Sequence, residues 1–373
     1  MYNPGNNIPP NDKVVVGYYV PWGQVEPEQI NYSLLTHILY GFDEYYDGTR
    51  IKKIQQLAAQ HGVKSLISIG GWSGSLTFST IAKDPSLTEE FIQNALHFVR
   101  PGGYNLDGID IDWEFPVWHG NESNERDPND TANYLILLRK LRDALDREFG
   151  PGRKLITAAV RIEPFFDPNR QPMTDVSAFG QVFDFITIMA YDIHGPWSST
   201  TGPNAPFQTD SRDSNTFCFA QSIQSWLRAG FPANKLVGGL AFYGRSSTAC
   251  VDMLQCPGNI YVPKESRVPK GDKFDTGEGD NCSGVWKYAS MREHIIELGG
   301  YAKNGWVSQW DQGTQTPWVF NPQTRVFITY DDVNSIGIKV NHAKQWGIRG
   351  VMIWEMSMDY NNELTQAANA IRY

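Results

Sequence analysis

Hydrophobic residues in this chain gather in short runs rich in β-branched and aromatic side chains, and each run is followed by a stretch with helical character. Eight such runs occur, over residues 13–19, 36–42, 64–69, 106–113, 154–161, 183–190, 235–242 and 350–354. Several are apolar almost throughout, as in VVVGYY and GVMIW, which is typical of parallel strands covered on both faces. Eight strands alternating with helices predict an α/β fold, a closed (β/α)8 or TIM barrel.

The clearest helix is predicted over residues 130–149, where apolar side chains recur at helical spacing. Its buried stripe is expected to consist of Tyr134, Leu138, Leu141, Leu145 and Phe149. Asp130 is expected to cap the first turn, and Gly150-Pro151 to end the helix. Similar patterns predict helices over residues 51–61 and 88–99.

Residues 246–325 break this alternation. The segment is rich in loop-forming residues and holds short strand-like pieces (NIYVP, VWKYA, PWVFN) in place of a single helix. Such a length exceeds any ordinary connection, so we predict a small α+β subdomain inserted after the seventh strand. The barrel would then comprise residues 1–245 and 326–373, and the insertion residues 246–325.

Composition and charge narrow the range of partners. The chain has 373 residues, of which 41% are hydrophobic, so it can bury a large core. Its formal net charge of -9 argues against nucleic acid or an anionic membrane as partner, because a polyanion would be repelled. No apolar stretch reaches the length of a membrane span, and the polar residues 1–12 contain no signal core, so any leader is expected to have been removed.

Cysteine and aromatic residues add two expectations. Cys218, Cys250, Cys256 and Cys282 form an even set, which favours disulfides and an extracellular location, although the sequence leaves all three possible pairings open. No CxxC element or histidine pair stands at ligand spacing, so no metal or other cofactor is expected. Aromatic residues make up 13% of the chain, a supply suited to core packing and to stacking against flat sugar faces.

The run LDGIDIDWE, over residues 106–114, carries the candidate chemistry. Successive side chains alternate along a strand, so Asp110, Asp112 and Glu114 share one face and the apolar residues 109, 111 and 113 share the other. The apolar face is expected to pack on the helices, which leaves the acidic face inside the barrel and Glu114 at its carboxyl end. Buried neighbouring carboxylates raise the pKa of at least one member, as a general acid requires. The spacing of a calcium loop is absent.

This acidic strand resembles the signature DxxDxDxE of glycoside hydrolase family 18, the chitinases, which Asp107, Asp110, Asp112 and Glu114 meet in full. Further segments similar to family motifs are SIGGW at 68–72, MAYD at 189–192, FYGR at 242–245 and YDD at 330–332. They fall in the right order on the expected strands, and the resemblance covers nearly the whole chain. Trp354 stands where the family keeps the tryptophan that floors the sugar site.

The resemblance implies retaining, substrate-assisted hydrolysis of β-1,4-linked N-acetylglucosamine polymers, with no protein nucleophile. Glu114 would protonate the glycosidic oxygen while the substrate's acetamido oxygen attacks the anomeric carbon, and would then act as base toward water. Asp112 would stabilise the oxazolinium-like charge, helped by the Tyr191 hydroxyl. Asp110 would share a proton with Asp112.

The resemblance also implies the residues that bind sugar. The pocket for the sugar bearing the scissile bond would comprise Tyr18, Phe42, Met189 and Trp354, with a polar rim of Asp192, Tyr243 and Arg245. Neighbouring sugars would stack on Trp22, Trp72 and Trp197. Ser68 and Asp107 are expected to hydrogen-bond within the barrel interior. Arg161 and Glu163 stand where many relatives carry small residues, and their effect on substrate choice stays open.

Two other functions use the same barrel. A chitin-binding lectin typically loses the acid and keeps the aromatic groove, so the presence of Glu114, Asp112 and Tyr191 argues against it. An endo-β-N-acetylglucosaminidase acting on N-glycans shares the acidic signature but usually lacks the insertion, which here would deepen the cleft. The expected partner is therefore chitin or a chitooligosaccharide, bound by a secreted monomer. Endo or exo action, the direction of processing, the source and a separate chitin-binding module stay open.

Overall fold

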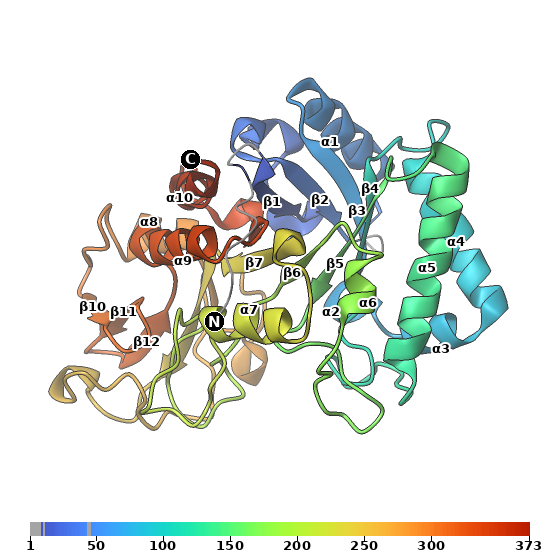
Figure 1. The fold of residues 1–373 in the computed structure, drawn as a ribbon. Coiled ribbons are helices and arrows are strands. Elements are labelled where there is room, and N and C mark those ends of the chain that lie inside the picture. The colour runs from blue at the N-terminus through green and yellow to red at the C-terminus, as the bar shows by residue number, and fades with distance from the viewer. Residues whose placement is uncertain (1–8, 10–11, 43–45) are drawn as a thin grey trace.

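The computed structural model describes residues 9, 12–42 and 46–373. Within them, eight parallel strands close into a barrel in the order β1-β13-β7-β6-β5-β4-β3-β2 (Figure 1). The strands are β1 (Val14–Tyr19), β2 (His37–Gly41), β3 (Lys64–Gly70), β4 (Gly108–Asp112), β5 (Leu155–Val160), β6 (Phe185–Ile188), β7 (Leu236–Ala241) and β13 (Gly350–Trp354). The predicted (β/α)8 barrel is confirmed. The polar start predicted over residues 1–12 lies almost wholly outside the described residues.

Helices cover the outside of the barrel, and α3, α4 and α5 lie together on one side of it (Figure 1). The α-helices are α1 (Gly48–Gln60), α2 (Gly71–Gly74), α3 (Phe78–Lys83), α4 (Pro85–Val99), α5 (Asp130–Phe149), α6 (Ser177–Gly180), α7 (Phe219–Arg228), α8 (Tyr288–His294), α9 (Val333–Gln345) and α10 (Glu363–Asn369). None in the described part of the chain is long and apolar enough to cross a membrane.

The expectation that a helix follows each strand is wrong at two crossovers. Between β1 and β2 the chain forms only short 3-10 turns, which begin at Pro21, Pro27 and Tyr32. Proline has no backbone N–H and therefore cannot extend a helix beyond its first turn. Between β5 and β6 the only helix is the single turn α6.

Two predicted side-chain roles are also corrected. Asp130 is the first residue of α5 rather than its cap, which is Asn129, and its buried carboxylate accepts a hydrogen bond from Ser79 Oγ (2.6 Å). Asp107 lies at the amino-terminal end of β4 and pairs with Lys64 Nζ (2.9 Å), both partly exposed, so it does not enter the barrel interior. The two aspartates therefore form structural contacts at opposite ends of the barrel.

Residues between β7 and α9 form a second sheet, antiparallel and in the described chain five-stranded, in the order β10-β11-β12-β8-β9. Its strands are β8 (Tyr243–Thr248), β9 (Val285–Lys287), β10 (Val307–Asp311), β11 (Thr316–Asn321) and β12 (Val326–Thr329). The sheet fits the α+β insertion, and in Figure 1 its strands β10–β12 lie across the barrel from α5. A domain boundary between residues 245 and 246 would fall inside β8, and the division of the chain remains a prediction.

The four cysteines form no disulfide in the structure. Cys218 is buried at the start of α7, where its Sγ accepts a hydrogen bond from the Gln221 N–H (3.2 Å), and the Cys282 thiol donates to the Gly277 carbonyl (3.4 Å). Cys250 and Cys256 are at least partly exposed. The disulfides expected from an even count of cysteines are therefore not seen, and the extracellular location that depended on them stays a prediction.

Candidate active site

Strand β4 turns its carboxylates into the barrel. Asp110 and Asp112 are buried there, whereas Ile109, Ile111 and Trp113 pack with the helices in the outer hydrophobic core. β4 pairs in parallel with β3 on one side and β5 on the other. Glu114 is the second residue beyond the end of the strand, which places it at the carboxyl end of the barrel.

Asp110 is held by three hydroxyl groups. Its Oδ2 accepts hydrogen bonds from Tyr18 Oη (2.7 Å) and Ser68 Oγ (2.7 Å), and its Oδ1 accepts one from Thr157 Oγ1 (2.6 Å). Burial raises the pKa of Asp110, but the three donated bonds oppose that rise because they stabilise the charged form. Ser68 therefore lies in the barrel interior, as predicted.

Asp112, the next acid on this face, has no such hydroxyl donor among the described residues. Its Oδ1 is buried and has no hydrogen-bond partner among the residues that the structure describes. Burial raises the pKa of Asp112 well above its ordinary value, and the charges of Glu114 and Asp110 raise it further. The protonated form of Asp112 is therefore favoured, and one of its oxygen atoms stays free for another partner.

Glu114 is anchored through its main chain. Its N–H donates to Ser75 Oγ (3.0 Å), and its carbonyl accepts from Asn124 Nδ2 (2.6 Å). Burial, and secondly the negative charge of Asp192, raise the pKa of Glu114 from 4.5 to about 8. A carboxyl group with this pKa holds a proton at neutral pH and can give it to a bound molecule.

A cleft of about 1180 Å³ opens in front of these acids. The predicted site residues that line it are Tyr18, Phe42, Trp72, Asp112, Glu114, Met189, Tyr191, Asp192, Trp197, Arg245 and Trp354. Asp110 and Tyr243 do not line the cleft but hydrogen-bond to residues that do. Trp22 lies outside it, with its ring 6.3 Å from that of Phe42.

Aromatic rings build the floor and rim of the cleft. The Trp354 ring lies 5.3 Å from the ring of Tyr18 and 6.0 Å from that of Phe42. Trp72 and Trp197 leave 54% and 58% of their surface exposed, unlike core tryptophans. The apolar C–H face of a sugar ring can stack on such surfaces.

A polar network centred on Asp192 faces the acids. Asp192 Oδ1 accepts hydrogen bonds from Tyr243 Oη (2.5 Å) and from Arg245 Nε (2.7 Å). The Arg245 guanidinium lies 4.9 Å from the centre of the Trp197 ring. Burial holds the pKa of Tyr191, which also lines the cleft, well above its usual range, so its hydroxyl stays protonated as a hydrogen-bond donor.

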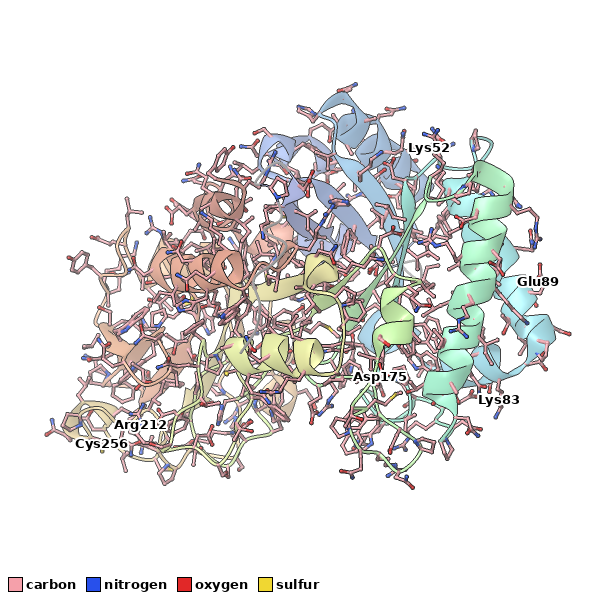
Figure 2. All side chains as sticks on the ribbon, viewed as in Figure 1. Lys52, Lys83, Glu89, Asp175, Arg212 and Cys256 are labelled. Atoms are coloured by element: carbon pink, nitrogen blue, oxygen red, sulfur yellow. The ribbon has the colours of Figure 1, made fainter. Side chains whose placement is uncertain are left out.

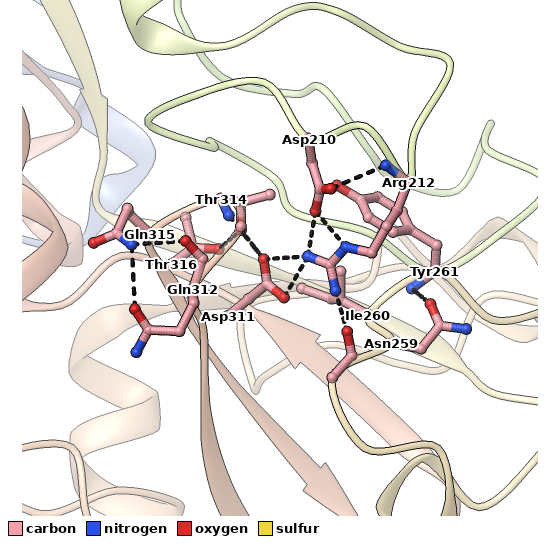
Figure 3. Close-up of polar contacts among 12 residues, drawn as sticks. Asp210, Arg212, Asn259, Ile260, Tyr261, Asp311, Gln312, Thr314, Gln315 and Thr316 are labelled. Atoms are coloured by element: carbon pink, nitrogen blue, oxygen red, sulfur yellow. Dashed lines mark hydrogen bonds and ion pairs between the residues drawn. The ribbon is translucent and has the colours of Figure 1, made fainter.

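The sequence analysis missed the part of the cleft wall that residues 212–217 form, late in the loop between β6 and α7. Arg212 binds Asp210 and, through Nη2, both carboxylate oxygens of Asp311 (2.7 and 2.9 Å), and it also donates to the Gly258 carbonyl (Figure 3). Because Asp311 belongs to β10, this cluster ties the loop to the inserted sheet. Only the charged run TDSRD hinted at it, and no local pattern pairs a loop with a strand 99 residues away.

The next residue of this loop contacts the earlier part of the same loop, soon after it leaves β6. Asp213 Oδ2 lies 3.1 Å from Nε2 of His194, and both residues line the cleft. In Figure 2, Arg212 lies near Cys256 at the insertion end, far from the exposed Lys83 and Glu89 of the helical side. The loop therefore spans from barrel to insertion. No group of three or more His, Cys, Asp or Glu side chains suited to a metal ion occurs in the described chain.

The chain is similar to known proteins over most of its length. A family model described as "Glycosyl hydrolases family 18" matches residues 14–359. The chain is 33% identical to a "chitinase-like effector" of Moniliophthora roreri, covering 95% of this chain and 91% of that protein. It is 34% identical to "Chitinase A1" of Niallia circulans, covering 86% of this chain and 44% of that protein. The crystal structure of a chitinase from Rhizomucor miehei matches with a TM-score of 0.88 at 32% identity, over 97% of this chain and all of that one (100%).

Proposed function

The chain belongs to the glycosyl hydrolases of family 18, and we propose that it hydrolyses β-1,4 linkages between N-acetylglucosamine units of chitin and chitooligosaccharides. One observation carries the proposal. The Glu114 carboxyl group, whose pKa is raised to about 8, lines an aromatic cleft at the carboxyl end of the barrel. This is the position and the protonation state that a general acid needs.

Glu114 takes both proton-transfer roles in this proposal. In the first step it donates its proton to the glycosidic oxygen, while the acetamido oxygen of the same substrate attacks the anomeric carbon and the leaving sugar departs. In the second step the ionised Glu114 removes a proton from water, which opens the oxazolinium-like intermediate with retained configuration. Acid and base roles reverse on one carboxyl group, as microscopic reversibility requires.

Asp112 and Tyr191 would stabilise the charge that develops on the acetamido group. The free Oδ1 of Asp112 is a ready acceptor for the acetamido N–H, and the protonated Tyr191 hydroxyl is a donor for its carbonyl oxygen. Asp110 has three hydroxyl donors and Asp112 has none, so a proton shared by the two rests on Asp112 in the free enzyme. That proton would move toward Asp110 when Asp112 turns to the substrate.

Binding of chitin without hydrolysis is the competing function. We consider it because one relative is named a chitinase-like effector rather than a chitinase. A binding protein needs the aromatic floor but gains nothing from an acid of high pKa beside a second buried acid whose oxygen has no hydrogen-bond partner. Action on N-glycans is the third function. The tie between Arg212 and the inserted sheet holds one wall of the cleft in place, and a walled, deepened cleft favours a linear polymer over a branched glycan.

The test is product release from three substrates: acetylated chitohexaose, a fully deacetylated chitosan hexamer of the same length, and an N-glycosylated glycoprotein. Release from the acetylated hexamer alone is expected, because the acetamido oxygen is the nucleophile. Equal turnover of the deacetylated hexamer would contradict substrate assistance. Binding of acetylated hexamer without release would establish a lectin, and release from the glycoprotein alone would establish glycan hydrolysis. Activity should survive EDTA, since the proposed steps use no metal. Secretion and a monomeric state remain predictions.

A further inference from the structure

Arg161 places a guanidinium group in the wall of the cleft. It is the first residue after β5, and it lines the cleft together with Glu114 and Phe115. Its side chain is 26% exposed. None of the steps proposed above uses this cation.

The guanidinium is held in a fixed position. Its Nε donates to Glu163 Oε2 at 2.8 Å. The central carbon lies 5.7 Å from the ring centre of Phe115, 5.4 Å from that of Trp118 and 5.5 Å from that of Phe166. Trp118 and Phe166 stack on each other at 5.1 Å, so the aromatic surface beneath the cation is itself rigid. A side chain ordered in advance loses little conformational freedom when a ligand binds.

The hydrogen-bonding capacity of Arg161 is largely unused. Its two terminal nitrogen atoms donate to no residue in the described chain, and only Nε has a partner. Arg212 differs, because its terminal nitrogens bind Asp311, Asp210 and the Gly258 carbonyl. Glu163 does not line the cleft, so the positive member of the Arg161–Glu163 pair faces the ligand space.

We propose that Arg161 is a specificity-determining residue that favours a neutral, N-acetylated sugar beside Phe115 over a cationic, deacetylated one. Its terminal N–H groups donate to a hydroxyl or acetamido oxygen of that sugar, and its charge repels the ammonium group of a glucosamine unit. Glu163 partly offsets the repulsion. The inference rests on the proposed function but concerns a sugar other than the reacting one, whose acetamido group serves as nucleophile.

The experiment measures binding rather than turnover. All variants carry Glu114→Gln, and calorimetry gives the affinity for acetylated chitohexaose and for a hexamer of equal length that contains glucosamine units, at a pH where the amines are charged. The ratio of the two affinities reports the selectivity. Thermal unfolding of each variant checks that the protein is folded.

Arg161→Gln is expected to lower the ratio about fivefold, the effect of one unit charge a few ångströms away in water. Glu163→Gln is expected to raise the ratio, because it leaves the cation uncompensated. Arg161→Lys keeps the charge and loses the planar fork, so the ratio should hold while both affinities fall. At about 1 M salt the screening length shrinks to about 3 Å and the variants should converge.

An unchanged ratio in both Arg161→Gln and Glu163→Gln would overturn the inference and leave the proposed function intact. A ratio that rises in Arg161→Gln would overturn it as well, since the cation would then favour the deacetylated sugar. Failure of the Glu114→Gln protein to bind either hexamer would overturn the proposed function together with the inference.

Discussion

Two groups of carboxylates lie in or next to the walls of the same cleft and behave in opposite ways. On β4 and just beyond it, burial raises the pKa of Asp110, Asp112 and Glu114, and no cationic side chain in the described chain contributes to any of the three. In the loop that forms the opposite wall, the Arg212 guanidinium lowers the pKa of Asp210. A buried acid without a cation holds a proton and can do chemistry, whereas an acid with a cation stays charged and holds a loop in place.

The largest expected effect comes from removing the proton donor of the first group. Glu114→Gln keeps the size of the side chain and cannot release a proton, so kcat on chitohexaose should fall by about 10²–10⁴-fold. Asp311→Asn, in the second group and outside the cleft lining, is the matched control and should keep kcat within about threefold. Steady-state kinetics on both variants measures the difference. Equal losses would mean that the two groups do not differ as described.

Asp112→Asn should have the next largest effect. The amide cannot carry the negative charge that stabilises the intermediate, so a loss of about 10²–10³-fold in kcat is expected, with a smaller change in KM. Asp110→Asn is the comparison, because its three hydroxyl donors would lose a charged acceptor without direct loss of a substrate contact. A larger kcat loss in Asp110→Asn would reverse the roles given to the two acids.

The carboxylates bound to Arg212 should contribute to the free energy of unfolding rather than to catalysis. Asp311→Asn weakens a charge-assisted, bidentate interaction of a carboxylate that is 4% exposed, so we expect a loss of about 1–3 kcal/mol in the free energy of unfolding. Differential scanning calorimetry would show this as a lower Tm. An unchanged Tm, with the wall loop as resistant to proteolysis as in wild type, would show that the cluster does not hold the loop.

The contribution of Glu114 to the stability of the fold should depend on pH. Its folded pKa of about 8 lies above its ordinary value of 4.5, so the folded state binds the proton more tightly than the unfolded state does. That stabilisation is complete below about pH 4.5 and is lost as the pH rises through about 8. Glu114→Gln should therefore raise Tm relative to wild type by roughly 1–3 °C at pH 9 and not at pH 4. The same gain in Tm at both pH values would contradict the raised pKa of Glu114.

The sequence predicted the barrel well because each strand is encoded locally. An apolar run such as GVMIW predicts both the length of a strand and its burial. The alternation of apolar and acidic residues in LDGIDIDWE predicts which face of the strand Asp110 and Asp112 occupy. The crossover between β1 and β2 was misjudged because Pro21 and Pro27 replace the periodic helix that the barrel pattern led us to expect. The cleft lining was predicted chiefly where a residue stands within or next to a motif, as with Tyr191 and Trp354.

Features that depend on contacts distant in sequence could not be predicted. Arg212 and Asp311 meet only because the insertion folds back on the loop after β6, and neither residue lies in a recognisable pattern. The sequence singled out Arg161 and Glu163 but not the aromatic surface beneath Arg161, which draws Phe115 and Phe166 from two separate loops. The disulfides were wrongly predicted because an even number of cysteines does not indicate which thiols lie close together in the fold.

The pH dependence of kcat/KM for wild-type hydrolysis of chitohexaose tests the central claim most directly. The substrate is uncharged, so the profile reports the free enzyme's acid, coupled to its neighbours on β4. We predict that activity persists through neutral pH and declines with a midpoint near 8, as Glu114 loses its proton. A decline with its midpoint near the ordinary value of 4.5 would contradict the claim that burial keeps this acid protonated.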